Sequence, residues 1–271
     1  MLIAHISDTH LKPPGKLAYG RVDTALMLKT CVEALLRLDP QPDLIVHTGD
    51  LTDLGRPEEY DHLKAILAPL KAPVLAVPGN HDERDAMRAA FAAAGYFPAQ
   101  GFLHYAVERG PLRILGVDTV VPGQGGGELC AERLAWLDAR LAERPVMPTV
   151  VLMHHPPFLT GIAHMDRIGL SGRDGFADIM GRHRQVEVIL CGHVHRIIRA
   201  SVGGRAAMIG PSPAHQVALD LSPEGPSAFM MEPPGYMLHR FANDGLVSLA
   251  AVLGTWPGPF PFFDAEGKLI D

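Results

Sequence analysis

Histidine, aspartate and asparagine side chains gather at the ends of five apolar runs in this chain, the stretches 3–10, 44–50, 74–82, 150–155 and 188–195. The polar residues that close these runs are Asp8, His10, Asp50, Asn80, His81, Asp82, His154, His155, His193 and His195. Their carboxylate, imidazole and amide groups suit Fe, Mn, Zn or Co better than Cu(I) or Ca²⁺. The pattern therefore predicts a metal centre that uses no thiolate.

The run 44–50 shows how a strand can aim one of these side chains. Its apolar, β-branched residues indicate a buried strand, and Gly49 lets the backbone turn so that Asp50 stands at the strand's carboxyl edge. If two ions lie about 3.5–4 Å apart, a carboxylate between them bridges, and a bridging solvent molecule becomes a nucleophile at neutral pH. We expect Asp50 to be this bridge.

Two of the runs carry ligand-type residues at alternate positions, Asp8 with His10 and His193 with His195. Residues i and i+2 of a straight strand point to the same side. Each pair is therefore expected to offer two ligands from one short segment, which suits two adjacent ions.

The elements that hold these runs alternate between strands and helices, which favours an α/β fold with a covered, parallel or mixed sheet. Apolar periodicity and end signals predict helices over 23–38, 57–70, 84–95 and 131–141. A hairpin is expected from 102–107 and 112–118, and further strands over 238–240 and 246–252. The sequence shows no internal repeat or linker, so residues 1–271 are expected to form a single domain.

Composition narrows the classes of function. A net charge of −6 and a pI near 6.1 provide no basic stripe, which weighs against a nucleic-acid partner. Cys31, Cys130 and Cys191 are widely spaced, which fits a reducing cytoplasm better than a disulfide framework. The sequence has no apolar run of 18 residues, so we expect a soluble cytoplasmic protein without a membrane partner.

Two later segments lack a clear period. Segment 210–240 is rich in Gly, Pro, Met and aromatic residues and is expected to form a loop-rich cap. The same segment is expected to take part in forming a homo-oligomer, because its apolar surface would otherwise be exposed. The tail 254–271 is rich in Pro and Phe, and its sequence assigns it no role.

The five runs, taken in order, resemble the calcineurin-like metallophosphoesterase superfamily. The resemblance rests on the motifs Asp8-x-His10, Gly49-Asp50, Gly79-Asn80-His81-Asp82, His154 and Gly192-His193-x-His195. Within the superfamily, the stretches 4–10, 55–60, 154–157 and 237–240 are similar to bacterial class III cyclic nucleotide phosphodiesterases and, more closely, to their glycerophosphodiesterase branch. This similarity extends to about residue 250.

The resemblance implies a fold, a pair of metal ions and a set of roles. The fold is a four-layer αββα sandwich of two mixed β-sheets flanked by helices, with the small cap near the site. One divalent ion would take Asp8, His10, Asp50 and His195, and the other would take Asp50, Asn80, His154 and His193. His81 would contact the phosphate and assist the leaving group as the catalytic residue. The substrate side would be lined by Asn80, His81, His155 and His215.

The remaining polar residues of interest receive simpler interpretations. Asp82 is expected to cap the following helix or to accept hydrogen bonds beside the site. His164 and His215 are loop histidines that could line a pocket. The other histidines, His5, His47, His62 and His183, are interpreted as ordinary strand or surface residues.

The reaction implied by the resemblance is metal-dependent hydrolysis of small phosphodiesters of the glycerophosphodiester type. Segments 156–170 and 210–240 supply apolar residues and few cations, mainly Arg167 and Arg240, which suits a diester with one negative charge. A 3′,5′-cyclic nucleotide phosphodiesterase is the alternative, and a phosphomonoesterase is less favoured. Every ligand position holds a competent residue, which argues against a non-catalytic scaffold.

Overall fold

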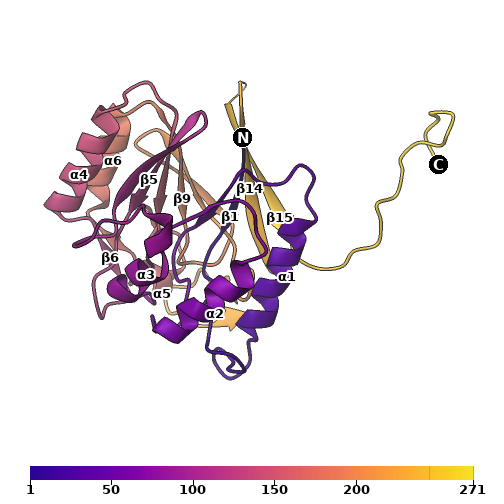
Figure 1. The fold of residues 1–271 in the computed structure, drawn as a ribbon, viewed down its shortest axis with the longest axis horizontal. Coiled ribbons are helices and arrows are strands. Elements are labelled where there is room, and N and C mark those ends of the chain that lie inside the picture. The colour runs from indigo at the N-terminus through magenta and orange to yellow at the C-terminus, as the bar shows by residue number, and fades with distance from the viewer. Residues whose placement is uncertain (244, 271) are drawn as a thin grey trace.

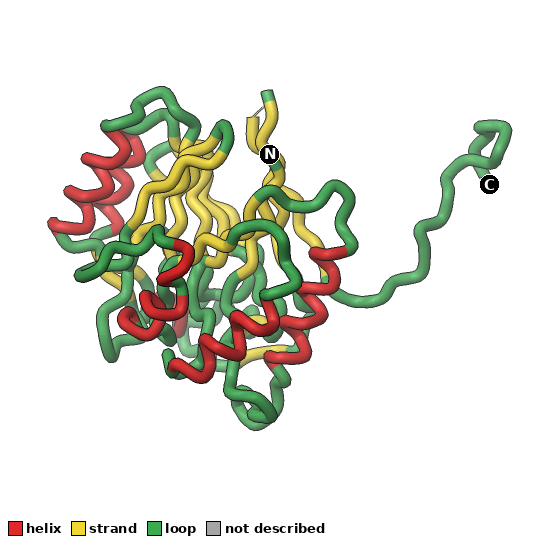
Figure 2. The backbone as a smooth tube through the Cα atoms, viewed as in Figure 1, coloured by secondary structure: helices red, strands yellow, loops and turns green. Residues whose placement is uncertain are grey.

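Apolar strands of this chain assemble into two mixed β-sheets that pack face to face (Figure 1, Figure 2). The computed structural model describes residues 1–243 and 245–270. The first sheet consists, in spatial order, of β15 (Gly245–Val252), β14 (Gly235–Ala242), β1 (Leu2–Ile6), β2 (Leu44–His47) and β3 (Val74–Ala76). The second consists of β10 (Ile198–Val202), β11 (Arg205–Ile209), β9 (Val186–Cys191), β7 (Thr149–Met153), β5 (Leu112–Val117) and β4 (Tyr105–Arg109).

Parallel pairing brings the carboxyl ends of the ligand-bearing strands together. In the first sheet β1, β2 and β3 run parallel, and in the second sheet β5, β7 and β9 do so. Ile3 and Val46 of the first sheet pack with Ile114 and Val150 of the second in a buried core. The loops that follow β1, β2, β3, β7 and β9 therefore meet at one end of the sandwich.

Helices cover the outer faces of both sheets (Figure 1). α1 (Thr24–Leu36) and α2 (Pro57–Leu67) lie over the first sheet, where Leu35 packs with Ile45 of β2. α4 (Ala131–Ala142) and α6 (Arg173–Arg182) lie over the second sheet, where Leu137 and Phe176 pack with Ile189 of β9. The expected four-layer αββα arrangement is confirmed. None of the described helices is long and apolar enough to cross a membrane.

All four helices predicted from periodicity form, with small shifts at their ends. α1 begins after Asp23, whose carboxylate accepts a first-turn backbone N–H at 2.9 Å. α3 (Arg84–Ala90) is shorter than predicted, because a 3₁₀ turn (Ala92–Ala94) follows it and ends at Gly95 with φ +69°. The carboxylate that caps α3 is Glu83.

Segment 210–240 is divided between an irregular part and the first sheet. Its last residues lie in β14, which pairs antiparallel with β1, so the loop-rich part ends at 234 and is smaller than predicted. The irregular part carries one short hairpin, β12 (Gln216–Val217) with β13 (Phe229–Met230). Nearby short elements are β6 (Gly127–Glu128), β8 (Leu170–Ser171) and α5 (Ala163–Asp166). The tail after β15 extends away from the rest of the chain (Figure 1).

Candidate metal centre

The loops at the carboxyl ends of the strands bring all seven predicted ligands into one buried cluster. Six of them, Asp8, His10, Asp50, His154, His193 and His195, are at most 5% exposed. Asn80 is partly exposed at the edge of the cluster. Ligand-type atoms of these residues fall into two neighbouring groups that share Asp50.

The first group consists of Asp8, His10 and His195. His10 Nε2 lies 3.1 Å from His195 Nε2, and His195 Nε2 lies 3.4 Å from Asp8 Oδ1. His10 Nε2 is also 3.5 Å from Asp50 Oδ2. The other oxygen of Asp8, Oδ2, is buried and has no hydrogen-bond partner among the described residues.

The second group consists of Asn80, His154 and His193. The three atoms Asn80 Oδ1, His154 Nε2 and His193 Nδ1 lie 3.1 to 3.2 Å from one another. His154 Nε2 is 3.4 Å from Asp50 Oδ2. Asp50 Oδ2 therefore lies between the two groups, while its Oδ1 accepts the backbone N–H of His81 at 2.8 Å.

The outer ring nitrogens determine which way each imidazole presents its lone pair. His154 Nδ1 donates to Thr48 O at 2.8 Å, His193 Nε2 donates to Ile168 O at 3.0 Å, and His195 Nδ1 donates to His215 O at 3.0 Å. A neutral imidazole that donates from one nitrogen carries a lone pair on the other. In their neutral forms these three histidines therefore aim lone pairs into the cluster.

His10 differs, because its outer nitrogen faces a carboxylate without forming a hydrogen bond. Its Nδ1 faces Asp53 Oδ1 at 3.5 Å, and Asp53 is held by Lys12 Nζ at 2.6 Å. Converging lone pairs 3.1 to 3.2 Å apart repel each other unless a proton or a metal ion lies between them. An ion bound to imidazole at about 2.1 Å separates its ligand atoms by about 3.0–3.4 Å, so the spacing fits a metal ion in each group.

Electrostatics of the cluster also favour positive charge. Although burial disfavours its charged form, Asp50 is kept ionised by His154 and His81, which hold its pKa well below the usual range. Burial lowers the pKa of His154, but Asp50 outweighs it and raises that pKa to about 9. Burial raises the pKa of Asp8 to about 6. A proton or a metal ion is therefore drawn to the space around Asp50.

The backbone at the cluster is unusual, because five of the ligand-type residues have positive φ. The angles lie between 42° and 73° for Asp8, His10, Asp50, His193 and His195. Such left-handed conformations cost about 1–3 kcal/mol each and persist where surrounding structure enforces them. They also correct the straight-strand prediction, since these residues follow the strands and His193 and His195 turn toward different groups.

Two glycines allow this close packing of loops. A Cβ at Gly79 would lie 2.2 Å from Asp50 Oδ1 and 2.3 Å from Asp50 N. A Cβ at Gly192 would lie 2.2 Å from Ser7 Oγ and 2.8 Å from Asp8 Oδ2. Both positions exclude every side chain, because such distances are well inside van der Waals contact.

Asp82 ties the loops together as a hydrogen-bond acceptor. Its carboxylate accepts the backbone N–H groups of Leu51, Thr52 and Gly79 and the hydroxyl of Tyr60, at 2.9 to 3.2 Å. Of the two predicted roles, helix cap and acceptor beside the site, the structure supports the second. This carboxylate fixes the loop after β2 to the loop after β3.

A cavity of about 390 Å³ opens onto the cluster. Among its lining residues are the predicted substrate-side residues Asn80, His81 and His215, and also His164, which lies in α5. His81 is one-third exposed, and its Nδ1 donates to Asp53 O at 2.8 Å, which leaves Nε2 for the cavity. Burial opposes protonation of His81, but Asp50 and Asp53 raise its pKa.

His155 does not line this cavity. Its Nδ1 contacts Thr119 Oγ1 at 2.8 Å, its Nε2 donates to Gly125 O at 3.1 Å, and its ring lies 4.5 Å from that of His193. The predicted substrate contact is therefore not seen, because both ring nitrogens are engaged in the protein interior. The ring instead supports His193.

Two residues near the centre were not identified from the sequence. Asp53 faces both His10 and His81, and Tyr19 meets His215 edge-on beside the cavity, with ring centroids 5.3 Å apart. Asp53 follows Asp50 by three residues in the loop after β2, and this spacing was its only signal. Tyr19 lies in a loop without periodicity.

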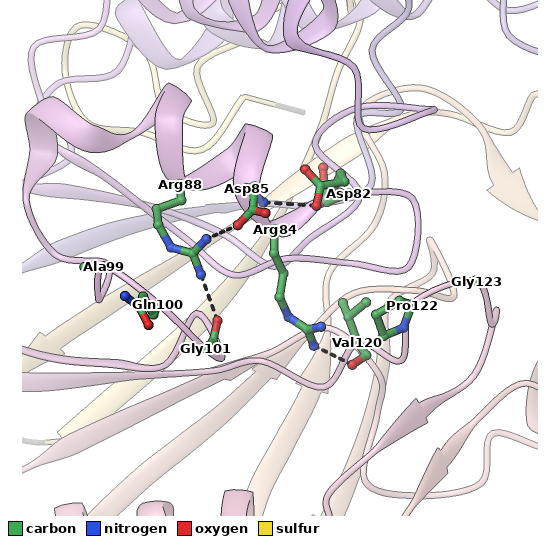
Figure 3. A pocket seen from close by; sticks show the side chains of 11 residues that line it. Asp82, Arg84, Asp85, Arg88, Ala99, Gln100, Gly101, Val120, Pro122 and Gly123 are labelled. Atoms are coloured by element: carbon green, nitrogen blue, oxygen red, sulfur yellow. Dashed lines mark hydrogen bonds and ion pairs between the residues drawn. The ribbon is translucent and has the colours of Figure 1, made fainter.

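A second cavity, of about 440 Å³, lies beside the start of α3 and contains none of the predicted ligands (Figure 3). Its two arginines are already engaged. Arg88 pairs with Asp85 and donates to Gly101 O, and Arg84 donates to Val120 O. Arg84 also forms a two-point ion pair with buried Asp118. This cavity therefore offers no unengaged arginine to an anion.

Comparisons with known proteins agree with the geometry. Residues 1–196 match the sequence profile of the family described as calcineurin-like phosphoesterase. The chain is 39% identical, over all of both sequences, to a protein of Arcobacter nitrofigilis named probable glycerophosphodiester phosphodiesterase GpdQ. It is 33% identical to the 3′,5′-cyclic adenosine monophosphate phosphodiesterase CpdA of Escherichia coli K12, over 78% of this chain and 75% of that one.

A solved structure shares the fold. The dimetal phosphatase from Danio rerio superimposes with a TM-score of 0.61 at 15% identity, covering 94% of this chain and 99% of the other. At this level of identity the likeness concerns the fold alone.

The close contact at Gly79 yields a test of the geometry. Gly79→Ala should lower affinity for Mn²⁺ by at least about tenfold, because the new Cβ displaces Asp50 from its position between the two groups. Gly181→Ala in α6 is the matched control, since its Cβ meets nothing closer than 4.0 Å, and it should bind Mn²⁺ normally. Isothermal titration of the metal-free protein with Mn²⁺ measures the affinity of both variants. Equal affinity in the two variants would contradict the placement of Asp50.

Proposed function

Because the chain belongs to the calcineurin-like phosphoesterase family, we propose that it hydrolyses small phosphodiesters at a centre of two divalent metal ions. The observation that carries the proposal is the convergence of four imidazoles around Asp50, each with an outer nitrogen facing a carbonyl or carboxylate oxygen. The relatives named as glycerophosphodiester and cyclic nucleotide phosphodiesterases support the same class of reaction.

The chain offers one set of ligands for each ion. Asp8, His10 and His195 would hold one ion and Asn80, His154 and His193 the other, with Asp50 shared. The ions, which Fe, Mn, Zn or Co could provide, would polarise the phosphoryl oxygens and acidify a water molecule toward neutral pH. The protein's own contribution is to fix the ligands before any ion binds, through the outer hydrogen bonds of the imidazoles.

His81 is the residue proposed to act on the substrate directly. Its backbone N–H is fixed by Asp50 and its Nδ1 by Asp53 O, so the ring is held at the cavity wall with Nε2 available. A protonated imidazole in this place can transfer a proton from Nε2 to the departing alkoxide.

The lining of the cavity favours a diester over a monoester. Its described lining residues include Tyr19, Met165, Ile168 and Phe229 but no lysine or arginine. Arg167 and Arg240, the cations noted in the sequence, do not line it. A dianionic monoester gains from fixed cations, whereas a monoanionic diester with two organic groups gains from apolar walls. A volume of about 390 Å³ suits a small molecule.

Glycerophosphodiesters are the substrates proposed, since the full-length relative at 39% identity carries that name. In hydrolysis by Mn²⁺-loaded enzyme, kcat/KM should rank glycerophosphoethanolamine above 3′,5′-cyclic AMP, and bis(p-nitrophenyl) phosphate above p-nitrophenyl phosphate. A monoester in first place would contradict the diesterase proposal. Cyclic AMP far above glycerophosphoethanolamine would assign the enzyme to the cyclic nucleotide branch.

The shared position of Asp50 predicts a difference between two ligand variants. Asp50→Ala should lose both ions, because its carboxylate borders both groups. Asn80→Ala removes one neutral ligand from one group, so its activity should fall and partly return at high Mn²⁺. Elemental analysis measures how many ions each variant retains, and a Mn²⁺ titration measures how much activity returns. Two bound ions in purified Asp50→Ala would show that Asp50 is not a bridge.

A proton-donor role for His81 predicts a dependence on the leaving group. His81→Ala should retain both ions but lose about 10²–10⁴-fold in turnover of alkyl diesters. The loss should be smaller for bis(p-nitrophenyl) phosphate, because nitrophenolate leaves without a proton. If the loss is the same for both substrates, His81 does not act as the acid.

We also propose that the protein forms a homo-oligomer in the cytoplasm. Its three cysteines are free, which suits a reducing compartment. Large apolar side chains remain exposed on β15 and on the tail, among them Leu249 at 50%, Trp256 at 61%, Phe260 at 75% and Phe262 at 77%. An extended tail with this composition is suited to packing against a second copy. Met230 and Met231 of segment 210–240 are exposed as well, at 49% and 57%.

Light scattering at micromolar concentration should therefore report a dimer or larger species. Replacing Phe260 and Phe262 with serine should shift the equilibrium between oligomer and monomer toward the monomer. Val146→Ser is the control, since this isolated side chain is 88% exposed on a different surface loop. A fully active wild-type monomer would contradict the proposal.

A further inference from the structure

Two histidines outside the metal centre are buried between the sheets. His5 on β1 and His239 on β14 are both 0% exposed, and neither contacts a predicted metal ligand through its ring. His5 lies in the sequence stretch 4–10 and His239 in the stretch 237–240, and the proposed mechanism gives neither histidine a role. A buried polar group costs free energy unless it is hydrogen-bonded, so their partners matter.

Strand register places these histidines in a line that crosses four adjacent strands. Ser248 of β15 lies directly opposite His239 of β14. His239 is paired with Ile3 of β1, which puts His5 on the diagonal two residues further along. His5 is paired with Val46 of β2, and Thr48 again follows two residues further on. The line therefore advances toward the strand ends that carry Asp8 and Asp50.

Polar contacts join each member of this line to the next. His239 Nδ1 lies 2.8 Å from Ser248 Oγ, and His239 Nε2 lies 3.4 Å from His5 Nδ1. His5 Nε2 lies 2.8 Å from Thr48 Oγ1, whose hydroxyl donates to Ser7 Oγ at 2.6 Å. Ser7 immediately precedes Asp8 in the chain.

The hydrogen bond from Thr48 to Ser7 fixes the direction of all the remaining hydrogen bonds in this series. Because its proton goes to Ser7, Thr48 must accept from His5 Nε2–H. His5 then has a lone pair on Nδ1, which accepts from His239 Nε2–H, and His239 accepts from Ser248. All donors in this series therefore point from β15 toward Ser7, the residue that precedes Asp8, and successive hydrogen bonds in such a series strengthen one another.

This arrangement requires each imidazole to be neutral and tightly held. Burial lowers the pKa of His5 well below its usual range and lowers that of His239 to about 4, so each ring carries one N–H near neutral pH. Gly210 leaves room for the His5 ring, since a Cβ there would lie 2.8 Å from its Cε1. Ser7 in turn is among the groups that oppose the effect of burial on the pKa of Asp8.

We infer that His239 and His5 form a hydrogen-bonded relay which acts through Thr48 and Ser7 to hold Asp8 in its metal-binding position. Both histidines are positioning residues, because neither touches the substrate cavity. Asp8 needs such support because its φ of +54° is a strained conformation that surrounding structure must hold. The inference rests on the proposed function in that it assigns the relay to one of the two ion sites.

Nearly isosteric substitutions can break the relay with little change in packing. In full-length metal-free protein titrated with Mn²⁺, Thr48→Val should weaken one of the two sites by about 10–100-fold, and Thr48→Ser should bind like wild type. His239→Phe should weaken the same site. In the Thr48→Val/His239→Phe double variant, the loss should be no larger than in Thr48→Val alone, because both changes break one chain. If the losses of Mn²⁺ affinity in the two single variants multiply in the double variant, the relay is overturned.

A measurement without metal keeps the inference separate from the proposed function. Amide hydrogen exchange of residues 7–10 should be faster in Thr48→Val and His239→Phe than in wild type. The control is His104→Phe, a buried histidine whose Nδ1 accepts the N–H of Asp118 at 2.9 Å in the second sheet. It should lower the melting temperature without affecting residues 7–10.

The outcomes distinguish the two claims. Unchanged exchange at 7–10 in both relay variants, or the same increase in His104→Phe, would overturn the relay whatever the metal content. Wild-type protein that binds fewer than two Mn²⁺ would instead contradict the proposed dinuclear centre.

Discussion

Repulsion among inward-facing imidazole lone pairs is the constraint on which the rest of the structure depends. His10, His154, His193 and His195 bring their inner nitrogens close to one another or to acceptor oxygens, at 3.1 to 3.5 Å. The outer nitrogens of His154, His193 and His195 donate to carbonyl oxygens that fix their tautomers, and that of His10 faces a carboxylate at 3.5 Å. A cation at each group converts this repulsion into coordination. The fold therefore holds in place an arrangement whose stability is completed by metal.

The sandwich enforces this arrangement through its loops and not through its strands. Five ligand-type residues adopt left-handed backbone conformations, and Gly79 and Gly192 let neighbouring loops approach to distances that no side chain permits. Asp82 fastens two of these loops, and the relay from His239 to Ser7 extends the support across the first sheet. Local strain of this kind is found where surrounding structure holds a functional geometry in place.

Much of this could be predicted from the sequence, because its strongest signals are local. Apolar runs that end in ligand-type residues marked ten positions, and the resemblance to the phosphoesterase family selected the seven that cluster. Periodicity predicted α1, α2, α3 and α4. α6 was missed since Gly175 and Gly181 weaken its pattern. β10 alternates apolar and polar residues and could have been predicted, whereas β11 lacks clear alternation. The divergence of His193 and His195 depends on positive φ angles, which spacing alone does not reveal. His5 and His239 look like ordinary strand residues until register places them on a diagonal between β1 and β14.

The measurement that tests the account most directly is an anomalous difference map from crystals of the protein grown with Mn²⁺. The account predicts two peaks in each subunit, one beside Asp8, His10 and His195 and the other beside Asn80, His154 and His193, with Asp50 in contact with both. A single peak, or peaks away from Asp50, would contradict the claim that converging lone pairs define a dinuclear centre.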